Sequence, residues 1–134
     1  MGRLRACVEA HGARLLYLHG SQNTGRLRAG SDLDLAVWFG EAARARAEEG
    51  PLLNDVVAAL PPDGPGLDLA VLDLAEPLLQ FTVLQGGTLL WASDPTAALE
   101  YRIRAAGAYH DTAKYRRRTH EYLKALAVGR GAGR

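Results

Sequence analysis

The alternation of acidic and apolar residues from Asp32 to Phe39 constrains the fold most strongly. The segment reads Asp-Leu-Asp-Leu-Ala-Val-Trp-Phe, and side chains two apart in an extended strand point to the same face. Asp32 and Asp34 would therefore share one face, about 6.5 Å apart along the strand. The other face would carry only apolar residues: Leu33, Leu35, Val37 and Phe39. This pattern predicts a strand that packs on a core and presents two neighbouring carboxylates.

Helix and strand patterns alternate along the rest of the chain. Strands are predicted over residues 14–19, 32–39, 67–72 and 88–91, and helices over residues 3–11, 41–60, 76–85 and about 95–127. Gly50-Pro51 is predicted to divide the second helix, because proline disfavours helix in the residue before it and starts helices well. Most strands are too far apart for simple hairpins. We therefore expect an α/β fold in which a small mixed sheet of about four strands is flanked by helices, with a long C-terminal helix.

Length and composition narrow the class of protein further. A chain of 134 residues fits one domain, predicted over residues 1–128, with a disordered tail over residues 129–134. The single cysteine, Cys7, excludes an internal disulfide framework and a cysteine-based zinc site. The sequence has no apolar run of membrane-spanning length and no pattern of a secretory signal peptide, so it predicts a cytoplasmic protein.

Charge is distributed unevenly along the chain. Residues 1–100 carry 7 Lys and Arg against 13 Asp and Glu, whereas residues 101–134 carry 9 against 2. A basic C-terminal segment on an acidic body favours contact with something anionic, such as nucleotide phosphates, RNA or an acidic protein face. A solvated helix face rich in arginine is the alternative interpretation.

A third carboxylate belongs to the predicted strand 67–72. There Asp68 would share a face with Ala70 and Leu72, and it could join Asp32 and Asp34 if the two strands are neighbours. Asp73 is an alternative, although it falls at the end of the strand and off that face. Clustered carboxylates repel one another unless a cation lies between them, and Mg²⁺ commonly binds one or two carboxylates together with substrate phosphates.

A Gly-Ser turn precedes these acids. Gly20 would let the backbone approach a phosphate closely, and Ser21 offers a hydroxyl and backbone N–H groups that can bind phosphate oxygens. A Gly-Ser turn alone is common, but its combination with Gly-Ser-Asp-Leu-Asp-Leu within 16 residues is a specific signal for nucleotide chemistry.

The run from Leu18 to Leu35 resembles the Gly-Ser…Gly…Ser-Asp-x-Asp motif of the polymerase-beta-like nucleotidyltransferases. The similarity is greatest to their minimal prokaryotic members, the MNT proteins. The resemblance implies nucleotide binding by four residues, Gly20, Ser21, Gly30 and Ser31. It also implies that the catalytic and metal-binding acids are Asp32, Asp34 and Asp68.

The same resemblance implies a reaction and a partner. MNT proteins are antitoxins encoded beside a HEPN RNase toxin, so the expected activity is Mg²⁺-dependent transfer of AMP from ATP to a tyrosine hydroxyl of that toxin. This chain departs from the family at Gln22-Asn23-Thr24, where many relatives have Arg-Ala-Arg. The departure removes two positive charges from the phosphate side, and Arg26 and Arg28 are candidates to replace them.

Two other functions are compatible with the sequence. One is nucleotidyl transfer to a small molecule or to an RNA end, and the other is an antitoxin that neutralises its toxin by binding alone.

Three further features have structural interpretations, with a functional alternative for each. His19 is interpreted as a packing or hydrogen-bonding residue and Trp38 as a core residue, with nucleotide contact as their alternative. The tyrosines of the last helix are interpreted as a packing stripe or a partner surface, with base stacking as the alternative.

Overall fold

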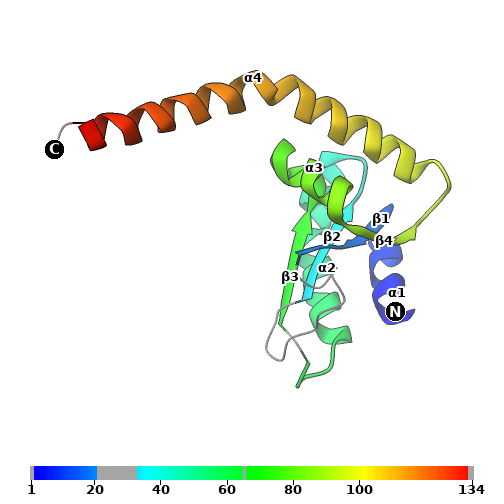
Figure 1. The fold of residues 1–134 in the computed structure, drawn as a ribbon. Coiled ribbons are helices and arrows are strands. Elements are labelled where there is room, and N and C mark those ends of the chain that lie inside the picture. Colours follow the sequence, from blue (N-terminus) through cyan, green and yellow to red (C-terminus); the bar gives the residue numbers. More distant parts are fainter. Residues whose placement is uncertain (1, 21–32, 65, 133–134) are drawn as a thin grey trace.

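The computed structural model describes residues 2–20, 33–64 and 66–132, with side chains as far as Val128. Its elements are α1 (Gly2–Ala10), β1 (Leu15–Leu18), β2 (Leu33–Trp38), α2 (Ala42–Ala59), β3 (Leu67–Val71), the 3₁₀ helix η2 (Leu72–Leu74), α3 (Pro77–Gly86), β4 (Thr88–Ala92) and α4 (Ala97–Ala132). The predicted fold class is confirmed: helices flank a four-stranded mixed sheet, and the last helix is long (Figure 1).

The sheet has the strand order β3-β2-β1-β4. β1 pairs antiparallel with both β2 and β4, whereas β2 and β3 are parallel. A parallel pair needs a crossover connection, and α2 provides it. Because β2 and β3 run in the same direction, residues near the start of each strand lie at the same edge of the sheet.

Two apolar cores cover the two faces of the sheet. On one face, α1 and α2 pack against the strand residues predicted to point there; the buried members include Val8, Leu16, Leu35, Val37, Phe39, Ala45, Leu52 and Val56. On the other face, α3 and α4 cover Leu15, Tyr17, Ala36 and Trp38 with Val83, Ala97, Tyr101 and Ala105. The period-two alternation predicted for β2 is therefore confirmed.

The predicted division of the second helix at Gly50-Pro51 is wrong. α2 is continuous from Ala42 to Ala59 with Pro51 inside it. A proline in a helix interior costs about 3 kcal/mol. Leu52 and Val56 follow Pro51 on the buried face and are fully buried, and burying a side chain of this kind contributes about 1.5–3 kcal/mol. Packing of the second half of α2 on the sheet thus offsets the loss at Pro51.

α4 extends beyond the predicted end near residue 127 and reaches Ala132. Gly107 lies inside it without interrupting it. The assignment of one domain to residues 1–128 and of disorder to the tail stays a prediction. None of the described helices combines the length and the apolar character that crossing a bilayer requires.

Candidate active site

Asp34 and Asp68 lie side by side on neighbouring strands. They are register partners in the parallel pair of β2 and β3, and adjacent strands are about 4.8 Å apart. Both lie on the face of the sheet that carries Ala36 and Ala70. Asp34 is half-buried and Asp68 is exposed. The structure thus brings together two of the three acids predicted from the sequence.

Gly20 packs against Asp34, one member of this carboxylate pair. Its φ angle is +74°, and a Cβ atom at this position would overlap the carboxylate oxygen Oδ2 of Asp34. The preceding residue is tied to the same strand, because the backbone N–H of His19 donates to the Asp34 carbonyl oxygen at 3.0 Å. The chain leaving β1 therefore passes directly against the acid, and only a glycine fits there without displacing the carboxylate.

The electrostatics of the pair favour a bound cation. Like charges directly opposite each other on adjacent strands are destabilising, and within the described residues neither Asp34 nor Asp68 has a basic partner. Hard divalent ions such as Mg²⁺ take carboxylate oxygens as ligands. The donor set and the shared face therefore fit such an ion.

The remaining predicted site residues lie outside the described residues: Ser21, Gly30, Ser31 and Asp32. The Gln22-Asn23-Thr24 departure, Arg26 and Arg28 lie there too. In the part of the chain that the structure describes, no group of three His, Cys, Asp or Glu side chains could hold one metal ion. The roles of these residues stay predictions.

His19 and Trp38, the two residues with nucleotide contact as an alternative interpretation, have different environments. The Nε2 atom of His19 is buried and has no hydrogen-bond partner among the described residues. Trp38 is a core residue, as interpreted from the sequence: it is 4% exposed, and its ring lies 5.5 Å from that of Tyr101. Its indole also lies 5.4 Å from the guanidinium groups of Arg14 and Arg104.

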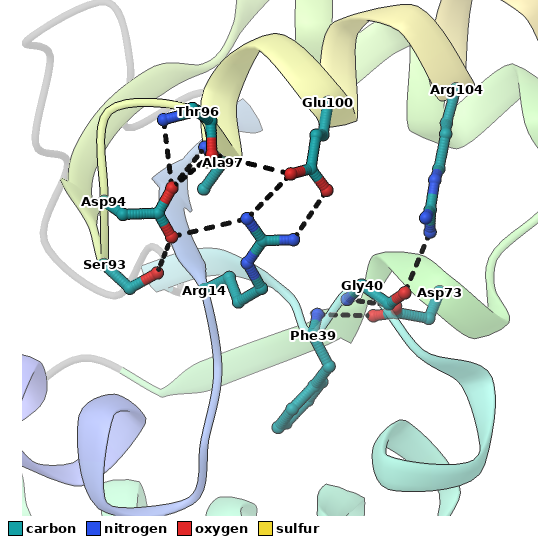
Figure 2. Close-up of polar contacts among 10 residues, drawn as sticks. All are labelled: Arg14, Phe39, Gly40, Asp73, Ser93, Asp94, Thr96, Ala97, Glu100 and Arg104. Carbon is teal, nitrogen blue, oxygen red and sulfur yellow. Dashed lines mark hydrogen bonds and ion pairs between the residues drawn. The ribbon is translucent and has the colours of Figure 1, made fainter.

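Asp73, the alternative third acid, has a structural role. Its carboxylate accepts hydrogen bonds from the backbone N–H groups of Phe39 and Gly40, both at 2.8 Å (Figure 2). Burial raises the pKa of this carboxyl above its ordinary value, while the two backbone donors act in the opposite direction. Asp73 therefore fixes the chain after β2, and Asp68 is the acid beside Asp34.

A second polar cluster fixes the start of α4 at the opposite end of β1. Arg14 donates to Glu100 at 2.7 and 3.2 Å and to Asp94 at 3.3 Å (Figure 2). Asp94 caps the helix by accepting from the backbone N–H groups of Thr96 and Ala97. Hydrogen bonds from the Thr96 and Ser93 hydroxyls, and then from Arg14, hold the pKa of Asp94 well below its usual range. The sequence analysis did not single out this arginine, whose only signal is its place at the head of an apolar strand.

Comparison with known proteins agrees with this geometry. The sequence profile of the family described as polymerase beta, nucleotidyltransferase matches residues 5–96. Comparison with curated proteins finds no match. Among solved structures, the chain is similar to one from a toxin-antitoxin crystal structure with AMP-PNP, with a TM-score of 0.70, 20% identity, and coverage of 91% of this chain and 97% of that chain.

A second similar structure comes from a complex of a tri-AMPylated Shewanella oneidensis HEPN toxin with its MNT antitoxin. Its TM-score is 0.60 at 17% identity, and the match covers 91% of this chain and 94% of that chain. At these identities the solved structures establish the shared fold.

Proposed function

Because this chain belongs to the polymerase beta nucleotidyltransferase family, we propose that it transfers AMP from ATP to a tyrosine hydroxyl of a HEPN RNase toxin. It would thereby act as the antitoxin of a toxin-antitoxin pair. The pairing of Asp34 with Asp68 beside Gly20 is the observation that carries the proposal. The similar fold of proteins solved with AMP-PNP and with an AMPylated HEPN toxin supports the choice of nucleotide and acceptor.

Asp34 and Asp68, together with Asp32, would hold Mg²⁺. When bound, the ion neutralises the negative charge of triphosphate oxygens and of the leaving pyrophosphate. Asp34 is half-buried and held through its backbone by His19, so its carboxylate is well placed to stay fixed. The Asp34 carboxylate packs against the backbone of Gly20, where no side chain fits, and a glycine lets a phosphate approach the backbone closely.

Of the two described acids, Asp68 is the better placed to take the proton of the acceptor. It is exposed whereas Asp34 is half-buried, so an incoming hydroxyl can reach it more easily. In the proposed step the hydroxyl oxygen forms a bond to the α-phosphorus of ATP, and the bond between that phosphorus and the bridging oxygen breaks. Pyrophosphate leaves, and the hydroxyl proton passes to Asp68.

Neutralisation by binding alone is a second candidate function. It is favoured by the exposed apolar residues on the second half of α4, among them Tyr115, Tyr122 and Leu123. A variant lacking both Asp34 and Asp68 carboxylates distinguishes the two functions. If binding suffices, that variant still protects cells from the toxin.

Transfer can be tested with ATP labelled at either the α- or the γ-phosphate. The purified chain, Mg²⁺ and the HEPN protein encoded beside it should yield a protein labelled from α-labelled ATP only. Asp34→Asn and Asp68→Asn should each lower the rate by about a hundredfold or more, equivalent to roughly 3 kcal/mol of lost transition-state stabilisation.

The matched control is Asp63→Asn, an exposed acid in the loop before β3. It should leave the rate within about twofold of the unaltered chain. Labelling that persists in both Asp34→Asn and Asp68→Asn would overturn the proposed metal site. Labelling from γ-labelled ATP would indicate phosphoryl transfer and would overturn the proposed reaction.

A further inference from the structure

The second half of α4 extends past α3 and away from the sheet (Figure 1). Near its start the helix packs closely, since Tyr101 and Ala105 are buried and Tyr109 stacks on Phe81 with ring centroids 3.9 Å apart. From Arg117 to Val128, by contrast, every residue is exposed. This segment therefore takes little stability from packing on the rest of the described chain, and short unpacked helices are marginal in water.

Five large apolar residues on the second half of α4 are exposed, with between 43% and 65% of each residue accessible: Tyr115, Tyr122, Leu123, Leu126 and Val128. Tyr115, Tyr122 and Leu126 recur at intervals of seven and four residues, so they lie along one side of the helix. A contiguous apolar stripe of this kind is typical of a surface that another molecule covers.

The stripe borders a groove of about 600 Å³ between the start of α3 and α4. Leu78, from the first turn of α3, forms one wall and is itself 53% exposed. Thr112, Tyr115, Thr119 and Leu123 line the groove from α4. Glu76, Pro77, Arg116 and His120 complete the lining, so the groove combines apolar walls with charged and polar groups. A groove of this kind beside a helix matches the helix-in-groove mode of recognition.

One wall of the groove is held in place by Arg116. Its guanidinium lies 3.5 Å from the centroid of the Tyr109 ring and donates to the Tyr109 carbonyl oxygen at 2.7 Å. It also donates to the Thr112 hydroxyl at 2.5 Å. Since Tyr109 stacks on Phe81 of α3, the groove is organised before anything binds, which lowers the entropic cost of binding.

Charge decides among the possible occupants. Residues 110–128 carry five Lys or Arg, at 114, 116, 117, 118 and 124, against the two acids Asp111 and Glu121. Glu76 adds one acid at the groove, so the basic residues remain in excess. A second copy of α4 would bring the same excess of positive charge against this face, and like charges across a helix interface are unfavourable. RNA would match the charge but would leave Leu123 and Leu126 without apolar contacts. An amphipathic helix with acidic flanks satisfies both the stripe and the charge.

We propose that the groove between α3 and the second half of α4 binds an amphipathic helix with acidic flanks from a partner protein. The groove is built from residues 76–78 and α4, whereas the candidate metal-binding carboxylates Asp34 and Asp68 lie on β2 and β3. Binding at the groove therefore goes beyond the transfer reaction and does not require it.

Two synthetic amphipathic helical peptides of about 20 residues test the proposal, one with glutamate and one with lysine flanking the same leucine stripe. In fluorescence anisotropy titrations of the full chain, the glutamate peptide should bind at least about tenfold more tightly. Leu123→Asp should weaken that binding by about tenfold or more. Added salt should also weaken the binding of the glutamate peptide to the unaltered chain, because the flanking charges are exposed.

Leu99→Asp is the matched control. Leu99 and Leu123 both lie on α4 and are both 57% exposed, but Leu99 does not line the groove. Binding should therefore be unchanged in Leu99→Asp. Tyr115→Ser, which also alters the lining of the groove, serves as a second groove variant, and circular dichroism of each variant shows whether α4 remains helical.

Four outcomes would overturn the proposal. Equal binding of the two peptides would remove the role of charge, and binding unaffected by Leu123→Asp would place the contact elsewhere. A concentration-dependent dimer that Leu123→Asp abolishes, measured by analytical ultracentrifugation, would assign the stripe to a second copy of this chain. Tighter binding of a single-stranded RNA than of the glutamate peptide would assign the segment to nucleic acid.

Discussion

Gly20 and Asp34 lie so close that a Cβ atom on residue 20 would overlap a carboxylate oxygen of Asp34. The contact joins the turn after β1 to the acid on β2, which are the two parts of the motif expected to bind phosphate and metal. A substitution at Gly20 therefore acts on the candidate metal ligand directly and on the phosphate turn at the same time.

Gly20→Ala should displace the Asp34 carboxylate and strain the backbone, because φ is +74° at this position. The left-handed conformation alone costs about 1–2 kcal/mol for alanine. We expect calorimetric titration with ATP and Mg²⁺ to show affinity reduced by about tenfold or more. Gly107→Ala is the control, since nothing lies within 4 Å of a Cβ atom there and alanine in a helix is favourable by about 0.5–1 kcal/mol. Unchanged ATP affinity in Gly20→Ala would contradict the proposed role of the turn.

Asp68→Asn should stabilise the protein in the absence of divalent ions. The substitution removes the repulsion between Asp68 and its register partner Asp34, which is worth about 0.5–1 kcal/mol. Urea denaturation in EDTA measures this gain. Addition of Mg²⁺ should then stabilise the unaltered chain but not the variant, since binding to the native state adds to its stability. A variant less stable than the parent in EDTA would show that the two carboxylates do not repel each other.

His19→Phe should raise the free energy of unfolding by about 1 kcal/mol. The buried Nε2 atom of His19 has no partner among the described residues, and an apolar ring of similar shape removes that unsatisfied group. Thermal or urea denaturation gives the difference. His110→Phe, at an exposed position of α4, should change stability by less than about 0.5 kcal/mol. Destabilisation by His19→Phe would mean that the imidazole makes a hydrogen bond that contributes to folding.

His11 should make stability depend on pH. Its ring nitrogens contact Glu48 at 2.7 Å and Asp55 at 2.5 Å, and these hydrogen bonds, the one to Glu48 first, raise its pKa above the ordinary 6.5. Because the pKa of His11 is higher in the folded chain than in the unfolded chain, the stabilisation from these contacts is fully present below pH 6.5. It is lost as the pH rises through the folded-state pKa. The stability difference between the unaltered chain and His11→Gln should thus be larger at about pH 6 than at about pH 9, by roughly 1 kcal/mol.

Urea denaturation of both proteins at the two pH values checks this expectation. His110→Gln, an exposed histidine of α4, should show no such dependence. A difference for His11→Gln that is the same at both pH values would mean that the charged imidazole does not stabilise α1 against α2.

The parts of the fold that depend on local periodicity were predictable. Alternation in residues 32–39 correctly assigned Asp34 to one face and Leu35 and Val37 to the other. The position of Asp68 followed from the same rule, once its strand was assumed to neighbour β2. The predicted polymerase-beta-like family and its fold are confirmed, because the motif from Leu18 to Leu35 is compact and specific.

Features that depend on distant residues were not predictable. Pro51 remains inside α2 because Leu52 and Val56 are buried against the sheet. A prediction from the local sequence alone does not include the energy of that packing. Arg14 meets Glu100 across 86 residues of sequence, a pairing that only the completed fold creates. The buried role of Asp73 likewise depends on the position of the chain after β2.

The parallel crossover from β2 through α2 to β3 also determines when the site can exist during synthesis. Asp34 and Asp68 become neighbours only after β3 has paired with β2, so a nascent chain that ends within α2 carries Asp32 and Asp34 but not Asp68. Cation affinity should therefore arise late, after the first two strands and α2 have emerged. N-terminal fragments that stop before Leu67 would be inactive in nucleotidyl transfer, whatever structure they retain.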